Sequence, residues 1–329
     1  MNAPTAAARW RAWALQALLI AAVLGAGWWV VEQALGTLRA RGVRSGFDFL
    51  RDAAGFEISE GWLAFDSTQP FWRAFLAGLV NTVRAAVPAT VIAVVLGTLI
   101  GIARLTPHRL VRGLADIYVQ TLRNVPLLVL LLLTYFALTH LLPDPEHPMQ
   151  LLPGVSLGKS GLVMPWPVHG QAGWALEWPE QTLFGVSGGA SLSPEYLAIT
   201  LALGLYTAAF VAEIVRAGIE SVGSGQVLAA RALGLPPAPV MRLVVLPQAL
   251  RLIVPALTSQ VLSLVKNSSL AVAIGYPELV SIANTSLNAT GRPFECIAVV
   301  MAVYLALSLL IALGMNLYNA RVALRGWSA

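Results

Sequence analysis

Cysteine and charge are both scarce in this chain of 329 residues. Cys296 is the single cysteine, so no disulfide can form within the chain. No group of histidines and acids accompanies it at the spacing of metal ligands, and we expect neither a metal site nor a cofactor. Charged residues make up 11% of the chain, whereas an ordinary soluble domain has about 25%. This shortage argues against a soluble fold.

Apolar residues fill the place of the missing charges. They make up 57% of the sequence, and the mean hydropathy is +0.72. The net charge of +5 does not indicate nucleic-acid binding, because the arginines stand singly or in pairs beside apolar runs, as at Arg104 and Arg321. The composition predicts one integral membrane domain.

Six apolar segments are long enough to cross a bilayer, which takes about 20 residues of helix. The expected helices cover residues 13–35, 74–102, 122–142, 195–219, 243–263 and 297–318. The first apolar stretch is longer than the core of a signal peptide, so we interpret it as an uncleaved anchor. The predicted fold class is therefore all-α, a polytopic bundle of about six membrane-spanning helices.

The distribution of arginine suggests an orientation with both termini in the cytoplasm. Residues 36–70, 143–194 and 276–294 would then lie outside, and residues 104–114 and 220–242 inside. We expect three regions: an N-terminal helix with an external segment (1–70), a core (71–322) with an external insertion at 143–194, and a cytoplasmic tail (323–329).

Two short motifs resemble catalytic or nucleotide-binding elements but lack their context. Gly158-Lys159-Ser160 resembles the end of a phosphate-binding loop, yet Pro153 stands where that loop needs a glycine. The stretch 185–188 (Gly-Val-Ser-Gly) resembles the serine motif of rhomboid proteases, yet all four histidines precede it, so the expected helix has no base. We expect neither nucleotide binding nor proteolysis.

Polar residues inside the expected helices are the first candidates for function, because ionisable groups are costly in a bilayer. Glu213 and Arg216 share a helix face, and either they pair with each other or Glu213 faces a translocation path. Lys266 and Asn267 interrupt an apolar run, and they either line a substrate cavity or form a polar turn.

A short stretch of mostly helix-forming residues between the fourth and fifth expected helices, at about 224–236, predicts an exposed cytoplasmic helix. Gly234 suits the left-handed position that ends a helix, and the prolines after it prevent continuation. We expect this helix to contact a partner. The candidate coupling residues are Gly225, Gln226, Leu228, Ala229, Ala230, Gly234, Leu246 and Pro247.

The spacing of Ala229, Ala230, Gly234, Leu246 and Pro247 resembles the signature of the inner-membrane components of binding-protein-dependent ABC importers. Further stretches resemble the polar amino acid group of that family: 78–82 (Gly-Leu-Val-Asn-Thr), 123–128 (Arg-Asn-Val-Pro-Leu-Leu), 212–219 and 266–270. The resemblance covers about 71–321. The extra first helix and the insertion are most similar to the general L-amino-acid permeases of Gram-negative bacteria.

This resemblance implies a permease subunit of the bacterial inner membrane that carries L-amino acids and is not itself an enzyme. The implied partners are a cytoplasmic ATPase dimer, a periplasmic binding protein, and a second permease, either unlike or identical. Leu228 replaces the glutamate of the signature, so contact with the ATPase would be apolar here. The alternative is a self-contained secondary transporter or channel, but the two halves of the chain show no inverted repeat.

Overall fold

The computed structural model describes residues 6–40, 46–170, 173–182 and 185–323 of the chain. The expected tail 323–329 therefore lies outside the described residues, except for Ala323.

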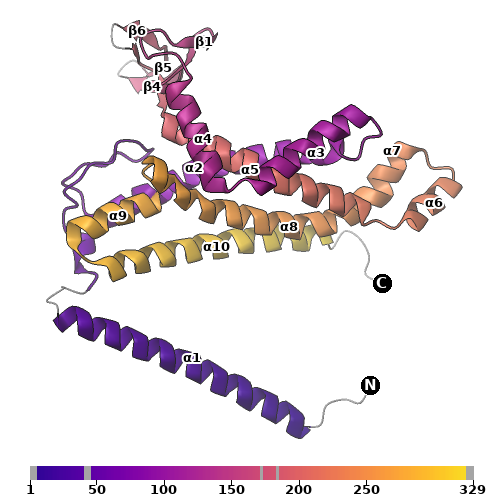
Figure 1. Ribbon diagram of the computed structural model, residues 1–329, viewed down its shortest axis with the longest axis horizontal. Coiled ribbons are helices and arrows are strands. Elements are labelled where there is room, and N and C mark those ends of the chain that lie inside the picture. The colour runs from indigo at the N-terminus through magenta and orange to yellow at the C-terminus, as the bar shows by residue number, and fades with distance from the viewer. Residues whose placement is uncertain (1–5, 41–45, 171–172, 183–184, 324–329) are drawn as a thin grey trace.

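Helices dominate the described residues (Figure 1). The α-helices are α1 (Ala6–Ala40), α2 (Phe71–Ala103), α3 (Arg109–Asn124), α4 (Leu127–His140), α5 (Pro194–Glu220), α6 (Ser224–Ala232), α7 (Pro237–Val240), α8 (Leu246–Asn267), α9 (Leu279–Thr290) and α10 (Pro293–Ala323). Short turns of other helix types are η1 (Asp48–Arg51), the π-helix η2 (Met241–Val245) and the 3-10 helix η3 (Ser268–Ile274).

The predicted all-α membrane bundle is confirmed. Within the described residues, five segments are long and apolar enough to cross a membrane: Trp13–Gln33, Phe71–Ala103, Pro194–Glu220, Pro237–Ile274 and Pro293–Leu317. The pair α3 and α4 makes a sixth span if it is counted as one.

The third expected helix, 122–142, is wrong as a continuous element. Helix α3 ends at Asn124, α4 begins at Leu127, and the two are bent by 106°. Pro126 explains the break, because a proline pushes the residue before it out of helical geometry, and Val125 has extended angles of φ −88° and ψ 130°. The basic stretch 104–114 likewise includes the first turns of α3.

Small residues bring α2 and α5 into close contact, because Gly97 and Gly101 stand four residues apart on α2, the spacing that lets two helix backbones approach. A Cβ atom built at Gly97 would lie 2.6 Å from Cβ of Val211, and one at Gly101 would lie 2.8 Å from the carbonyl oxygen of Ala212. Helix α5 packs between α2 and α8, and α10 lies along the outer side of α8 (Figure 1). The core of the bundle therefore centres on α5.

The insertion at 143–194 contains strands, which the sequence interpretation did not include. A four-stranded antiparallel sheet has the order β1 (Met149–Leu152), β2 (Val155–Gly158), β3 (Gly161–Met164) and β8 (Ala190–Leu192). Two hairpins complete it: β4 (Trp166–Gly170) with β5 (Gly173–Glu177), and β6 (Glu180–Thr182) with β7 (Gly185–Ser187). Strands of three to five residues carry too little alternation to be recognised in a sequence.

Both motifs that resemble catalytic or nucleotide-binding elements lie in this insertion, in its strands and the turns beside them. Lys159 occupies the turn between β2 and β3, where its Nζ is 2.7 Å from Oδ1 of Asp144. This ion pair holds the pKa of Asp144 below its ordinary value. Ser187 ends strand β7 rather than starting a helix.

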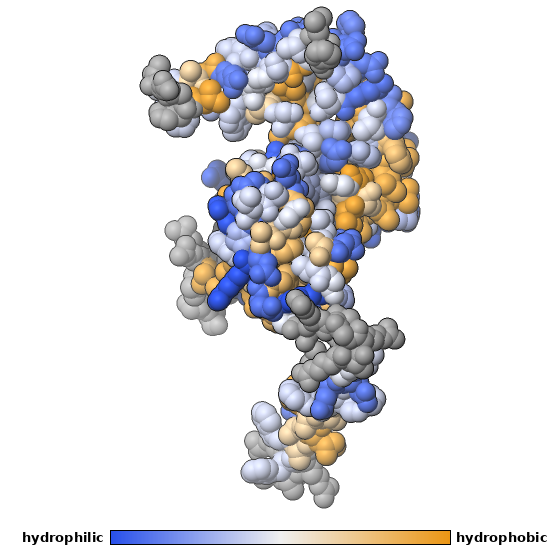
Figure 2. Space-filling view, turned by 90° about the vertical axis from the view of Figure 1, so that its left-hand side faces the viewer, coloured by the Kyte–Doolittle hydropathy of each residue, from blue (hydrophilic) through white to orange (hydrophobic). Residues whose placement is uncertain are grey.

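Helix α1 stands apart from the bundle, and all of its described side chains are exposed (Figure 1). Seen from the end of the bundle that carries α9, hydrophilic residues cover much of the surface and hydrophobic residues gather along one side (Figure 2).

The close contact of α2 and α5 predicts that Gly97→Ala destabilises the bundle. The added methyl group overlaps Val211 and the carbonyl oxygen of Ala208, and such overpacking costs about 1–3 kcal/mol. Thermal unfolding of the purified protein should show a lower midpoint. Gly113→Ala in α3 is the matched control, because no atom lies within 4 Å of its Cβ position, and its midpoint should stay the same or rise. Equal midpoints for both variants would contradict the packing argument.

Candidate functional site

Helix α6 ends in a Schellman motif at Gly234. Gly234 has φ +83°, its N–H donates to the carbonyl of Arg231 at 2.9 Å, and the N–H of Leu235 donates to the carbonyl of Ala230 at 3.2 Å. The predicted left-handed helix end is therefore confirmed. The prolines after it begin a new element, because Pro236 is the N-cap of α7 and Pro237 its first residue.

One apolar cluster holds α6 against the end of the bundle. Ala230 is buried beside Val240 and Val245, and Val227 and Leu235 pack against this cluster. Nε2 of Gln248 on α8 donates a hydrogen bond to Oε1 of Gln226 on α6. It also donates to the carbonyl oxygen of Val244 at 2.8 Å. The position of α6 is thus fixed relative to α8.

The other face of α6 is exposed and mixed in character, with Gln226 and Arg231 beside apolar residues. Leu228 is 63% exposed and Leu233 is 83% exposed, and Leu243 in the adjoining π-helix is 65% exposed. The structure brings the predicted coupling residues together: Gly225, Gln226, Leu228 and Ala229 are exposed, Ala230 is buried, Gly234 ends the helix, and Leu246 and Pro247 begin α8 beside it. Their coupling role stays a prediction.

Glu213 lies in a network of charges near the C-terminal end of α5. Its Oε1 is 2.5 Å from Nη2 of Arg216, and its Oε2 contacts Arg104 at the end of α2. Nη1 of Arg123 on α3 is 3.9 Å away from Oε2, and Arg104 also bonds Asp116 of α3 at 2.6 Å. The pairing of Glu213 with Arg216 is confirmed, and the network joins α2, α3 and α5.

Lys266 and Asn267 do not form a turn. The α-helix continues through both residues and becomes the 3-10 helix η3, which ends at Gly275 with φ +79°. The polar-turn interpretation is therefore wrong, because the helical backbone satisfies its own hydrogen bonds through residues 266–269.

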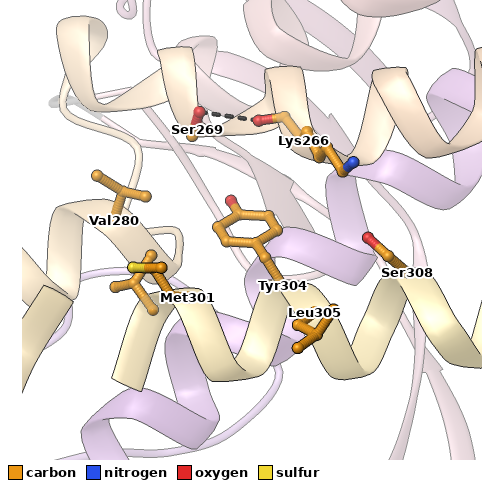
Figure 3. Close-up of a pocket in the computed structure, with 8 residues that line it drawn as sticks. Lys266, Ser269, Val280, Met301, Tyr304, Leu305 and Ser308 are labelled. Atoms are coloured by element: carbon orange, nitrogen blue, oxygen red, sulfur yellow. Dashed lines mark hydrogen bonds between the residues drawn. The ribbon is translucent and has the colours of Figure 1, made fainter. Parts of the chain in front are cut away.

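Lys266 lines a cavity of about 400 Å³ between α8 and α10 (Figure 3). Tyr304 and Ser308 project into it from α10, and the hydroxyl of Ser269 donates to the carbonyl oxygen of Lys266 at 2.8 Å. A role for Lys266 or Asn267 in the substrate path stays a prediction.

The structure does not bring Glu213 and Lys266 together. Gly218, one turn beyond Glu213, packs against Ile253 of α8. Lys266 lies 13 residues further along the chain than Ile253, which is about 20 Å along a helix. The two candidates therefore belong to opposite halves of the bundle.

The sequence interpretation missed a polar network at the opposite end of α2. Asn81 donates from Nδ2 to the carbonyl oxygens of Glu60 at 2.8 Å and Pro277 at 3.0 Å. The hydroxyl of Thr82 accepts the N–H of Leu279 at 3.2 Å, so it fixes the start of α9. Asn81 and Thr82 belong to the stretch 78–82, whose polar pair inside an apolar helix was the available signal.

Glu278 is a fully buried carboxyl at the start of α9, outside the spanning segments. Its Oε1 accepts the N–H of Ser281 at 2.8 Å as a helix cap, and its Oε2 accepts the hydroxyl of Tyr304 at 3.2 Å. Burial raises the pKa of Glu278 to about 7. A buried acid therefore joins α9 to α10.

These observations define an integral membrane protein whose helical bundle is joined at each end by polar contacts and carries an exposed helix after its fourth span. The chain belongs to the family of binding-protein-dependent transport system inner membrane components, whose model matches residues 93–324.

Relatives agree over nearly the whole length. The chain is 40% identical to the putative amino-acid ABC transporter permease protein YhdX of Escherichia coli K12, over 95% of this chain and 94% of that protein. It is 37% identical to the general L-amino acid transport system permease protein AapQ of Rhizobium johnstonii, over 94% and 91% respectively.

The fold matches a solved structure described as an amino acid ABC transporter with histidines. The TM-score is 0.57 at 27% identity, and the match covers 76% of this chain and 95% of that one. The MetNI methionine ABC transporter shares the fold alone, with a TM-score of 0.53 at 18% identity.

Because Glu278 is a buried carboxyl, we expect the stability of the protein to depend on pH, and we expect Glu278→Gln to remove this dependence. Because the pKa of Glu278 is about 7 in the folded protein and 4.5 ordinarily, the folded protein holds a proton between these values that the unfolded chain releases. The free energy of unfolding should therefore fall as pH rises through this window. The difference between the thermal midpoints at about pH 5 and about pH 8 should be larger for the wild type than for the variant.

The exposed residue Glu57 supplies the control for that experiment, since Glu57→Gln should keep the wild-type difference between the two pH values. A Glu278→Gln variant with the full wild-type difference would show that another group titrates.

Proposed function

We propose that this protein is the permease subunit of an ATP-driven importer that carries L-amino acids across the bacterial inner membrane. The observation that carries the proposal is α6, a short helix fixed at one end of the bundle with exposed leucines on its outer side. Helix α6 lies within the residues that the family model matches. The names of the two relatives support L-amino acids as the substrate.

The proposed partners follow from this family membership. Two copies of a cytoplasmic ATPase bind and hydrolyse ATP, a periplasmic binding protein delivers the amino acid, and a second permease completes the path. ATP binding closes the ATPase dimer, α6 moves with it, and the bundle changes from inward-facing to outward-facing. The chain itself then catalyses no reaction.

Both termini lie in the cytoplasm in this proposal, with α6 on the same side. The insertion and α9 then face the periplasm, where the binding protein approaches. In this proposal, region 1–70 is an added membrane anchor, and region 71–322 is the permease core.

Leu228 makes this subunit unlike one that carries the full signature. Leu228 and Leu233 offer apolar area to the ATPase, and no carboxylate stands at position 228 to pair with it. We infer that the second permease is a different chain and that the two ATPase contacts are unequal.

Glu213, Lys266 and Asn267 are the proposed substrate-path residues. Lys266 has the stronger support, because it lines a cavity inside the spanning region. Glu213 has a supporting role in the network of arginines, where it would change partners when α3 and α5 move.

Affinity purification from the native membrane tests the assignment. A tagged chain should retain an ATPase and a second permease, and uptake of labelled L-amino acids into proteoliposomes should require ATP inside and the binding protein outside. Uptake that continues with the ATPase omitted would instead support the secondary transporter.

Gly234→Val should separate ATP hydrolysis from transport. A β-branched residue is strained at φ +83°, so the end of α6 changes while the spanning helices keep their contacts. We expect the assembled complex to hydrolyse ATP but to lose about 5- to 150-fold in uptake per ATP, because that strain costs about 1–3 kcal/mol.

The matched control for this variant is Ala232→Val, which adds the same β-branched residue at an exposed position of α6 with ordinary helical angles and should transport normally. If Gly234→Val also transports normally, the coupling role of α6 is wrong.

A further inference from the structure

A second cavity, which we call the vestibule, opens at the end of the bundle that carries α9. Its volume is about 460 Å³, within the range of about 300–1,000 Å³ that is typical of small-molecule sites. Segment 46–70, the end of the insertion, the start of α5 and the turn before α9 all meet there. It is lined by Ser59, Glu60, Ser191, Ser193, Glu195 and Gly275, among others.

The ionisable residues among those that line the vestibule are both glutamates. Oε1 of Glu195, in the first turn of α5, accepts the hydroxyl of Tyr135 at 3.0 Å. Glu60 accepts the hydroxyl of Ser193, which also caps α5. The hydroxyls of Ser59 and Ser191 add polar atoms to the same wall.

A buried arginine lies behind one wall of the vestibule. Arg84 of α2 is 6% exposed, its guanidinium lies 4.5 Å from the ring centre of Tyr196, and its Nη1 is 2.9 Å from Oε1 of Glu60. Although these two atoms are buried and close, neither makes an aligned hydrogen bond within the described residues. Glu60 is therefore held in place, with Oε1 buried against Arg84 and Oε2 bonded to the hydroxyl of Ser193.

We propose that the vestibule is an entry site for free amino acids, in which Glu60 and Glu195 receive the α-ammonium group. This proposal rests on the transport function given above and adds a site on the external side, distinct from the cavity at Lys266. The amino acid released by the binding protein pauses here before it reaches the spanning region.

The chemistry of the cavity selects this group. An ammonium carries three N–H donors and no acceptor, and carboxylate and hydroxyl oxygens accept all three. The charges of Glu60, Glu195 and Arg84 sum to −1, so a group with positive charge is favoured over a free anion. Because Arg84 is covered by Glu60 and Tyr196, it offers its charge to Glu60 rather than to the solvent.

Charge-selective labelling of Ser191→Cys in the assembled complex, held in lipid nanodiscs, tests the site. Ser191 is exposed on β8, whereas the native Cys296 is buried. The cationic reagent 2-aminoethyl methanethiosulfonate should react faster than the anionic 2-sulfonatoethyl analogue, relative to their rates with a free thiol. Adding Glu195→Gln or Glu60→Gln should lower this preference about three- to tenfold, as expected when one nearby charge is removed at a partly exposed site.

Two controls sharpen the result. Glu57→Gln removes an exposed carboxylate from the same external segment and should leave the preference unchanged. L-alanine at tens of millimolar should slow the labelling, whereas N-acetyl-L-alanine, which lacks the ammonium, should not. Glu195→Gln keeps the test valid if Glu60→Gln disturbs folding by leaving Arg84 unpaired.

An unchanged preference in Glu195→Gln, or equal protection by both alanine compounds, would overturn the entry site. This measurement uses neither ATP nor the binding protein, so it does not depend on the uptake experiment. Loss of the ATPase requirement in uptake would overturn the proposed function and leave the labelling result in place.

Discussion

The close contact between α2 and α5 is the constraint on which the rest of the bundle depends. Glycines on α2 let the two helix backbones approach, and alanines on α5, such as Ala208 and Ala212, receive them. In a bilayer the packing of small side chains replaces much of the hydrophobic drive of a soluble core. Because α5 also packs against α8, this one contact sets the positions of both ends of the bundle, where the polar groups gather.

Those two ends use ionisable groups differently. Toward α6, arginines from α2, α3 and α5 share Glu213, so several helices are joined through one carboxylate. Toward α9, Asn81, Thr82 and Glu278 each bond to two partners, which are backbone groups or a hydroxyl. Loss of one of these buried bonds leaves an unsatisfied polar group.

The spanning helices and the end of α6 could be predicted because their signals are local. Apolar length identifies a span, and glycine followed by prolines identifies a left-handed helix end. The 106° bend at Pro126 was missed, since the apolar run from Leu127 continues a pattern that already fits one helix. The strands of the insertion and the vestibule were missed because they depend on pairing between distant residues. Glu60 meets Arg84 and Ser193 only after the chain has folded.

Helix α9 shows what such pairing means for the chain. It lies between Gly275 with φ +79° and Gly291 with φ +66°, so the backbone leaves both neighbouring helices through a left-handed residue. The helical hydrogen-bond pattern of η3 and that of α10 do not continue into α9, because each pattern stops at a glycine. The rotation of α9 about its own axis is consequently set by contacts with other elements: Thr82 of α2 accepts the N–H of Leu279, Tyr304 of α10 donates to Glu278, and Gly78 of α2 packs against Ile282. Its orientation is a tertiary property rather than a continuation of the spanning helices.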